Sequence, residues 1–366
     1  MKVLHLKPIA QSLLKFDEEH NRQDDEIRGD LSTVVNTENY LWLAFDKSVG
    51  VERLLKDGED YCHHKHFSLT EYIDLPADTS EEIDIEGLAY AGHYLWVVGS
   101  HSLKRDKPDD NSKKLKKRTK LLSKVKNDPN RYTIARIPLV KKQNNGEFTL
   151  RKSTYHPDRN GEELKAAKLK SGKKSSELSK ALKKDKHLKK FMKIPGKDNG
   201  FDIEGIAVIN DRIFLGLRGP VLCGWAIIIE IAVKEKKGKL KLKKIGRKKQ
   251  KYRKHFVDLK GMGIRELAVA KEDLLILAGP TLDCDGMMTL YRLNGGPEDQ
   301  KESLIEHEQL DKLFDVTLSH KHKYGKEKAE GVTLLDDKKL IVVYDEPSEN
   351  RQVGKSDVKV DIFEYK

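Results

Sequence analysis

One short segment of the chain is repeated, and this repeat limits what the chain can fold into. Asp84–Tyr90 reads Asp-Ile-Glu-Gly-Leu-Ala-Tyr, and Asp202–Val208 reads Asp-Ile-Glu-Gly-Ile-Ala-Val. Weaker copies begin at Asp30, Ile264 and Lys328, the first with Ser32 where the others have Glu. The copies are spaced by about 54 to 64 residues, with one gap about twice as long, and such a period indicates repeated supersecondary units.

Each unit is predicted to contain a short strand, a polar turn, a second strand and usually a third. The second strand is apolar on successive residues, as in Leu95–Val98 and Leu340–Val343, which indicates burial on both faces. Repeated antiparallel units of this kind are typical of an all-β β-propeller. We therefore expect a single domain over residues 1–366, with five blades, or six as the alternative. The segment Lys2–Leu6 is expected to supply the missing edge strand of the last blade and close the ring.

Three segments hold the basic excess of a chain whose net charge is +12. Residues 104–131, 165–197 and 234–254 contain 38 Lys/Arg and 7 Asp/Glu, whereas the remainder contains 33 Lys/Arg and 52 Asp/Glu. The predicted body is therefore acidic and its insertions are basic. The insertions, taken as 104–131, 160–197 and 234–254, are expected to be Lys-rich helices or hairpins, with helices over 112–126 and 163–192 and an exposed hairpin in 234–254.

The sequence has no opening apolar stretch like a signal peptide and no segment long enough to span a membrane. Its cysteines, Cys62, Cys223 and Cys284, are odd in number and dispersed. This pattern predicts reduced thiols and a cytoplasmic protein.

Carboxylates at the repeat positions predict a ring near one mouth of the propeller channel. Residues two apart on a strand point to the same face, so Asp84 shares a face with Glu86, and Asp202 shares a face with Glu204. Glu266 and Glu330 are the predicted equivalents of these glutamates. Such oxygen ligands could hold Ca²⁺ or Mg²⁺. The alternative is that each glutamate accepts hydrogen bonds from its own blade.

Loops that leave equivalent strand ends should cluster around the same mouth. His101 and Arg218 follow second strands, and we predict that they act catalytically, with His101 as the proton donor because its ordinary pKa is near neutral. The alternative for His101 is a hydrogen-bonded loop residue. The predicted ligand-binding residues are Ser100, Lys104, Arg105, Lys197, Asn199 and Asp345.

A second candidate metal site is the run Cys62-His63-His64-Lys65-His66. Neighbouring residues of a strand point to opposite faces, and the spacing differs from that of structural zinc sites. We therefore expect a solvated strand edge here.

The repeats and two further motifs, Gly99-Ser100-His101-Ser102 and the run Ile194–Gly205, carry a family resemblance. From about Asp30 onward the chain resembles an uncharacterised bacterial β-propeller family known only as a domain of unknown function. Its Asp-x-Glu-Gly repeat is also similar to the more distant esterase-like phytase and SdiA-regulated propellers. The first resemblance implies the fold, and the second implies phosphate-ester chemistry with metal ions.

Two functions follow from these patterns. The first is a propeller that binds a small anionic ligand at an acidic channel mouth, with metal-assisted phosphate-ester binding or hydrolysis. The second is a non-catalytic scaffold that recruits a protein, or binds nucleic acid non-specifically through the basic arms. The sequence contains no nucleophile elbow, Walker loop or dinucleotide fingerprint, so it does not decide whether the protein is an enzyme.

Overall fold

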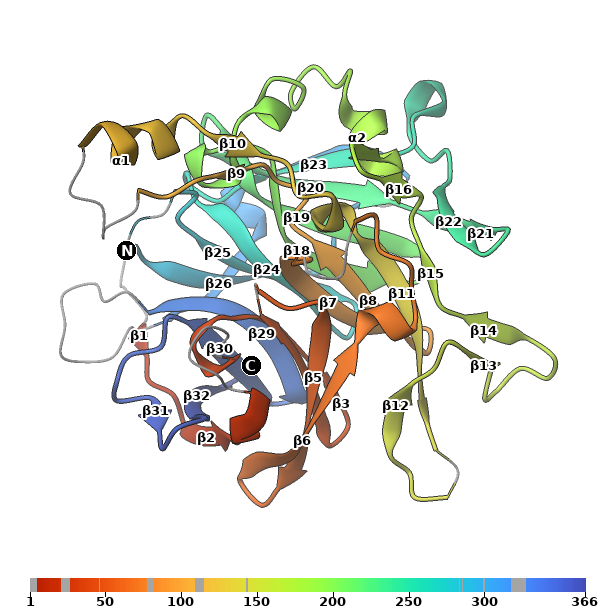
Figure 1. The fold of residues 1–366 in the computed structure, drawn as a ribbon, viewed down its shortest axis with the longest axis vertical. Coiled ribbons are helices and arrows are strands. Elements are labelled where there is room, and N and C mark those ends of the chain that lie inside the picture. Colours follow the sequence, from red (N-terminus) through yellow and green to blue (C-terminus); the bar gives the residue numbers. More distant parts are fainter. Residues whose placement is uncertain are drawn as a thin grey trace.

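The computed structural model describes residues 5–20, 27–45, 47–77, 82–108, 115–142, 144–282, 284, 286–298, 300–316 and 327–366. Within them, twisted antiparallel sheets surround a common axis, as a β-propeller requires (Figure 1). The expected all-β propeller fold is confirmed. No helix in this part of the chain has the length and apolar character needed to cross a bilayer.

Five repeated units build the sheets, and each begins with its innermost strand. Unit 1 contains β3 (Leu31–Thr37), β4 (Tyr40–Phe45), β5 (Gly50–Asp57) and β6 (Asp60–Ser68). Unit 2 contains β7 (Ile85–Ala91), β8 (Tyr94–Gly99), β11 (Ile134–Lys141) and β12 (Phe148–Leu150), with β15 (Ala167–Lys168) also paired to β11. Unit 3 contains β18 (Asp202–Ile209), β19 (Arg212–Leu222), β20 (Trp225–Ile231), β23 (Arg253–Asp258) and β27 (Ser303–Ile305).

The remaining two units include strands from the start of the chain. Unit 4 contains β24 (Gly263–Ala270), β25 (Asp273–Gly279), β26 (Met288–Leu293), β28 (Asp311–Val316) and β1 (His5–Leu6). Unit 5 contains β29 (Lys328–Asp336), β30 (Lys339–Asp345), β32 (Asp357–Glu364) and β2 (Ala10–Leu14), with the short β31 (Gln352–Val353) on β32. Units 5 and 1 form one sheet through a single parallel pairing between Leu14 and Tyr61.

Apolar side chains on both faces of the second strands hold the units together. In β8, Leu95 and Val97 pack toward unit 1, whereas Trp96 and Val98 pack toward unit 3. The same alternation divides the apolar residues of β4, β19, β25 and β30 between two neighbouring clusters. The clusters therefore run in a closed cycle through units 1 to 5, and the innermost strands β3, β7, β18, β24 and β29 contact one another in the same order.

Glycines in the repeat lie where neighbouring innermost strands approach most closely. A Cβ atom added to Gly205 would stand 2.6 Å from the backbone nitrogen of Leu267, and one added to Gly87 would stand 2.9 Å from that of Ile206. These distances are shorter than any normal carbon contact. Glycine is therefore required by the crowding of strands around the axis.

The strand that closes the ring differs from the predicted one. Ala10–Leu14 forms β2 and pairs antiparallel with β32, although we expected Lys2–Leu6 in this position. Within the predicted segment, Lys2–Leu4 lies outside the described residues, and His5–Leu6 forms β1 on unit 4. Gln11 and Ser12 hide β2 in the sequence, because they interrupt the apolar residues Ile9, Ala10, Leu13 and Leu14.

The predicted helix over 163–192 is largely wrong. The segment forms β14 (Glu163–Lys165), β15, β16 (Ser171–Gly172) and β17 (Ser175–Ser176) before a short helix, α2 (Glu177–Leu182). Ser176 caps this helix by accepting a hydrogen bond from the backbone nitrogen of Ser179, so the helix begins there. The apolar stripe does pack on the ring, since Leu178, Leu182 and Leu188 are buried between units 2 and 3.

The other basic insertions follow the predictions in part. A helix, α1 (Leu115–Leu122), lies within the predicted 112–126, but none of its residues is buried. It follows β9 (Lys104–Arg105) and precedes β10 (Val125–Lys126), which pair with each other (Figure 1). A hairpin of β21 (Val233–Lys236) and β22 (Lys239–Leu242) lies within 234–254 apart from its first residue, but Leu240 and Leu242 are buried, so it is not wholly exposed. The last short hairpin pairs β13 (Ser153–Tyr155) with β14.

Candidate functional site

Each innermost strand contains a β-bulge at the same repeat position. In β7 the pairing with β8 skips Glu86, and in β18 the pairing with β19 skips Glu204. The residues skipped in the other three strands are Ser32, Arg265 and Glu330. All five skipped residues line one cavity, so the bulge is the device that directs the repeat position into it.

Glu266 does not belong to this ring of residues, contrary to the prediction. Arg265 occupies the bulge position of unit 4, and Glu266 is the next residue along the strand. The Glu266 carboxylate accepts hydrogen bonds from Thr33 Oγ1 at 2.5 Å and from the Leu267 backbone nitrogen at 2.9 Å. Burial raises its pKa well above the ordinary range. Glu266 therefore links units 4 and 1 inside the ring, a structural role in which its side-chain partner belongs to another unit and not to its own, as the alternative had it.

The cavity has a volume of about 730 Å³, within the range of small-molecule sites. Its outer wall comes from the insertion between β8 and β11 of unit 2 (residues 102–108, Leu122 and Arg131) and from the turn Gly196–Asp198. The lining contains eleven Asp/Glu and nine Lys/Arg side chains. The lining is therefore of nearly balanced charge, with a small acidic excess, because basic loop residues face the carboxylates.

Arginines hold most of the glutamates at the ring positions. Glu204 contacts Arg218 through Oε1 at 2.6 Å and Arg265 through Oε2 at 3.0 Å. Arg265 Nε donates to Glu330 Oε2 at 2.9 Å, so this guanidinium lies between two carboxylates. Arg218 Nε also donates to the backbone oxygen of Thr281 at 3.0 Å. These buried contacts fix the donors and acceptors of the cavity floor in place.

A second arginine–carboxylate pair lies on the unit 2 side of the cavity. Arg131 Nη2 donates to Asp84 Oδ1, and Arg131 Nη1 donates to Ser102 Oγ, both at 3.0 Å. Arg131 belongs to the insertion and not to the repeat, so no pattern in the sequence pointed to it. The same applies to Arg265, whose position became evident only from the bulge register.

Asp202 has a buried carboxylate oxygen without a hydrogen-bond partner, and unlike Glu204 Oε2, which contacts Arg265, this oxygen has no ion pair among the described residues. Its side chain is 4% exposed, and Oδ1 has no hydrogen-bond partner among the residues that the structure describes. Burial, and then the negative charge of Glu204, raise the pKa of Asp202 to about 7. A side chain at Gly196 would collide with this carboxylate, which explains the glycine in the turn before β18. Asp202 can therefore exchange a proton near neutral pH.

His101, which we predicted as the proton donor, is not among the residues that line the cavity. Its Nδ1 lies 3.0 Å from the backbone oxygen of Gly99, and its ring packs edge-on against Tyr132. Burial lowers the pKa of His101 to about 4. In this geometry His101 is a buried loop residue outside the cavity lining.

The predicted ligand-binding residues divide into two groups. Lys104, Arg105, Lys197 and Asp345 line the cavity. Ser100 instead connects two units, because its backbone oxygen accepts from Ile203 and its nitrogen donates to the Asp84 oxygen. Asn199 has a left-handed backbone, and its side chain accepts from the Val221 nitrogen at 3.3 Å. The Gly-Ser-His-Ser motif therefore contributes a backbone hydrogen bond that connects units 2 and 3.

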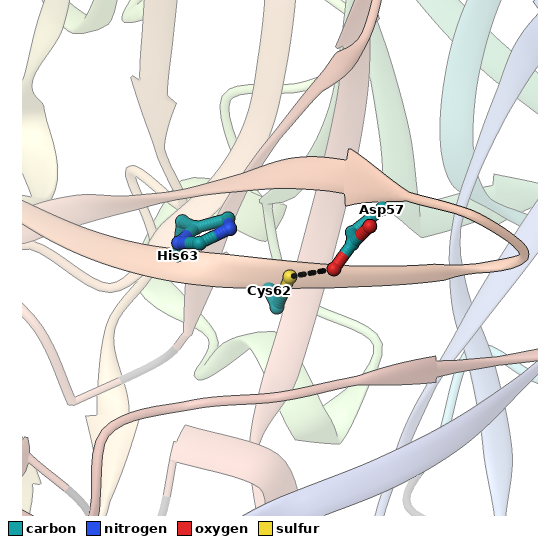
Figure 2. Close-up of side chains that lie close together, drawn as sticks. All are labelled: Asp57, Cys62 and His63. Atoms are coloured by element: carbon teal, nitrogen blue, oxygen red, sulfur yellow. Dashed lines mark hydrogen bonds between the residues drawn. The ribbon is translucent and has the colours of Figure 1, made fainter.

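Only two groups of three His, Cys, Asp or Glu side chains in the described part of the chain have ligand atoms within 4.8 Å of one another. One is Asp57, Cys62 and His63 (Figure 2), and the other is His93, His156 and Asp158. Neither group lines the cavity. The cavity carboxylates predicted as Ca²⁺ or Mg²⁺ ligands, Asp84, Glu86, Asp202, Glu204 and Glu330, do not form such a group.

The fold and the cavity define the class: a β-propeller with a polar cavity of ligand size at one mouth. The chain belongs to the family described as protein of unknown function DUF3616, whose family model matches residues 30–361. No curated protein matches the chain.

Solved structures resemble the chain only distantly. The β-propeller domain of Cps50 (Swd1) from Myceliophteria thermophila has 9% identity and a TM-score of 0.33, with 96% of this chain and 99% of that chain covered. A putative 6-phosphogluconolactonase from Bacteroides uniformis has 10% identity and a TM-score of 0.32, covering 91% and 73%. The PQQ-bound aldose sugar dehydrogenase of Streptomyces coelicolor has 10% identity and a TM-score of 0.33, covering 92% and 95%.

Proposed function

We propose that the cavity binds a small polar molecule with a phosphate or carboxylate group, and that Asp202 exchanges a proton or a hydrogen bond with it. The observation that carries the proposal is the unsatisfied Oδ1 of Asp202 in a cavity of about 730 Å³. A buried polar atom without a partner is costly, and a ligand hydroxyl or amine would satisfy it. The anionic group would meet Lys104 and Arg105 on the outer wall, where both side chains are partly exposed.

Calorimetry with inorganic phosphate and glucose 6-phosphate tests this proposal. We expect saturable binding of the sugar phosphate, weakened at least 10-fold by Asp202→Asn and by Lys104→Ala combined with Arg105→Ala. Lys239→Ala, on the hairpin remote in sequence from the cavity residues, is the matched control and should leave binding unchanged. Absence of heat with both probes, for a folded wild-type protein, would remove anionic small molecules from consideration.

A metal-assisted form of this function depends on the carboxylates. Ca²⁺ or Mg²⁺ would be bound first by Asp202, whose Oδ1 is unsatisfied, together with Glu86 from the neighbouring unit. Asp84, Glu204 and Glu330 would complete the ligand set only by giving up contacts with Arg131, Arg218 or Arg265. The ion would supply a Lewis acid for phosphate-ester hydrolysis.

Metal binding and turnover are measured separately. We expect Asp202→Asn with Glu86→Gln to abolish Ca²⁺ or Mg²⁺ binding in calorimetry and to leave the far-ultraviolet circular dichroism unchanged. Hydrolysis of p-nitrophenyl phosphate by the wild type, lost in Asp202→Asn, would make the protein an enzyme. Metal binding that survives both substitutions would contradict the assignment of the ligands.

The second candidate is a non-catalytic scaffold, and it is favoured by the exposure of α1. Leu115 is 75% exposed on a helix that carries Lys116, Lys117, Arg118 and Lys120. We propose that this arm binds polyanions without sequence preference. Filter binding in rising NaCl should show affinity that falls steeply with salt, and reversal of these four charges should weaken it. Binding that is insensitive to salt would exclude this function.

We also infer that the ring has five blades. The support is the cycle of five innermost strands and five apolar clusters. An experimental map with a sixth innermost strand between any two units would overturn the count.

A further inference from the structure

A β-bulge in the β5–β6 hairpin changes the direction of two adjacent side chains. Cys62 pairs with Leu55 and Lys65 pairs with Arg53, so β6 has one residue more than β5 in this interval. His63 absorbs the extra residue with a left-handed φ of 54°. Regular alternation would send Cys62 and His63 to opposite faces, and this was the reason for expecting no zinc site. The bulge removes that reason.

The bulge brings three different ligand types together. Ligand atoms of Asp57, Cys62 and His63 all lie within 4.8 Å of one another. Figure 2 shows Cys62 between the other two residues, with its sulfur directed toward Asp57. The Cys62 Sγ to Asp57 Oδ2 distance is 3.5 Å. A tetrahedral ion with Zn–S of about 2.3 Å and Zn–O of about 2.0 Å separates these two ligand atoms by about 3.5 Å.

The other two histidines of the run are already engaged. His64 Nε2 lies 2.8 Å from Glu52 Oε2, and His66 Nδ1 lies 2.7 Å from Glu52 Oε1. Within the run Cys62–His66, His64 and His66 contact the buried Glu52, whereas Cys62 contacts the exposed Asp57. Only Cys62 and His63 remain for an ion at the surface, where Asp57 and His63 are exposed and accessible to it.

We propose that Asp57, Cys62 and His63 bind a divalent transition-metal ion of the zinc type, with water as the fourth ligand. A thiolate with an imidazole selects such an ion over Ca²⁺ or Mg²⁺. Three protein ligands with one open position are typical of an accessible site. None of the three residues lines the cavity, so this site is distinct from that of the proposed function.

Metal binding at Asp57, Cys62 and His63 would have two consequences, one for the thiol proton of Cys62 and one for the stability of the ring. Burial and the hydrogen bond to Asp57 raise the pKa of the Cys62 thiol, so metal binding must displace the thiol proton into solvent. Cys62 follows Tyr61, whose pairing with Leu14 joins units 5 and 1. An ion bound here would therefore stabilise the hairpin that joins units 5 and 1, and should raise the melting temperature with the logarithm of the free ion concentration once this exceeds the Kd.

Cobalt(II) is the probe for the site, because thiolate ligation to Co²⁺ gives a near-ultraviolet charge-transfer band. We expect the reduced full-length protein to bind one Co²⁺ with this band and with the visible bands of a tetrahedral ion, and Zn²⁺ to remove both. Cys62→Ser should abolish the thiolate band, and His63→Ala should weaken binding at least 10-fold. Cys223→Ser is the matched control, an exposed thiol elsewhere, and should retain the band.

Three outcomes would overturn the proposal. The first is a band that survives Cys62→Ser. The second is Co²⁺ uptake without a thiolate band and lost in His93→Ala, which would assign the ion to His93, His156 and Asp158. The third is no uptake by the wild type at neutral pH. Circular dichroism of Cys62→Ser and His63→Ala verifies folding, and the Zn²⁺-dependent rise in melting temperature should be absent in both variants.

Discussion

At the residue scale, Asp202 links the chemistry of the cavity to the stability of the fold. Its pKa is raised to about 7, first by burial and then by Glu204. The folded state therefore binds this proton more tightly than the unfolded state, whose Asp pKa is about 3.9. Stability from this group is fully present below the unfolded value and is lost as the pH rises through 7.

Asp202→Asn should remove this loss, because an amide does not ionise. We expect the variant and the wild type to be similar near pH 4, and the variant to be more stable by about 2–4 kcal/mol above pH 7.5. Urea unfolding at several pH values measures the difference. Asp211→Asn, at an exposed turn, is the control and should follow the wild type throughout. A difference between Asp202→Asn and wild type that does not change with pH would contradict the raised pKa.

Single residues also mark the limits of the sequence analysis. The repeat period correctly predicted that Glu86, Glu204 and Glu330 share one position and meet in space. Glu266 was assigned to this position because of its residue type, whereas the backbone register gives the position to Arg265. The position of a β-bulge depends on the register between two paired strands, and the sequence of one strand does not determine that register. Arg131 was missed because long-range contacts decide where an insertion folds back.

At the element scale, three of the five innermost strands, β7, β18 and β29, depend on glycine at the residue after the bulge. A Cβ on Gly205 would lie 2.6 Å from the Leu267 nitrogen and 2.9 Å from the Glu266 carbonyl carbon, and both are backbone atoms that cannot turn aside. Adjacent strands would have to separate along the axis. The same arrangement holds for Gly87 and Gly331.

Gly205→Ala should therefore destabilise the protein by more than about 2 kcal/mol, which chemical denaturation would measure. Gly172→Ala is the matched control, since a Cβ there has no atom within 4 Å and its φ is not positive. That change should be neutral or slightly stabilising. Equal stability of the two variants would show that the crowding of the innermost strands is relieved at little cost.

Elements with a strong local signal were predicted well, and those with a long-range cause were not. The second strands are apolar on successive residues, and their burial on both faces is confirmed. Over 163–192, lysine-rich sequence with scattered leucines predicted a long helix. Instead, short strands, the helix α2 and the turns between them place these leucines in the apolar cluster between units 2 and 3. The β21–β22 hairpin contributes to the same cluster and contacts this segment. Tertiary packing overrides local propensity in such a segment.

At the scale of the whole molecule, the ring is closed by a strand from the start of the chain. β2 pairs with β32 over five residue pairs, from Ala10 with Ile362 to Leu14 with Val358. Gln11 Nε2 donates to Asp361 Oδ1 at 2.8 Å, and Leu14 is fully buried between units 5 and 1. β1 contributes much less, with two parallel pairs on β28. The repeat pattern predicted that an N-terminal strand closes the ring, but not which one.

Two truncations distinguish these strands. A chain that begins at Lys7 loses β1, and its melting temperature should fall by less than about 3 °C. A chain that begins at Phe16 also loses β2, which leaves the edge of β32 unpaired and opens the apolar cluster between units 5 and 1. We expect this second truncation to be insoluble or to lose its cooperative unfolding transition.

Leu14→Ala in the full chain tests the same strand if the truncated protein is not soluble. We expect this variant to lower the free energy of unfolding by about 2–5 kcal/mol. Equal melting temperatures for the two truncations, together with an unchanged Leu14→Ala variant, would mean that the ring holds without this strand.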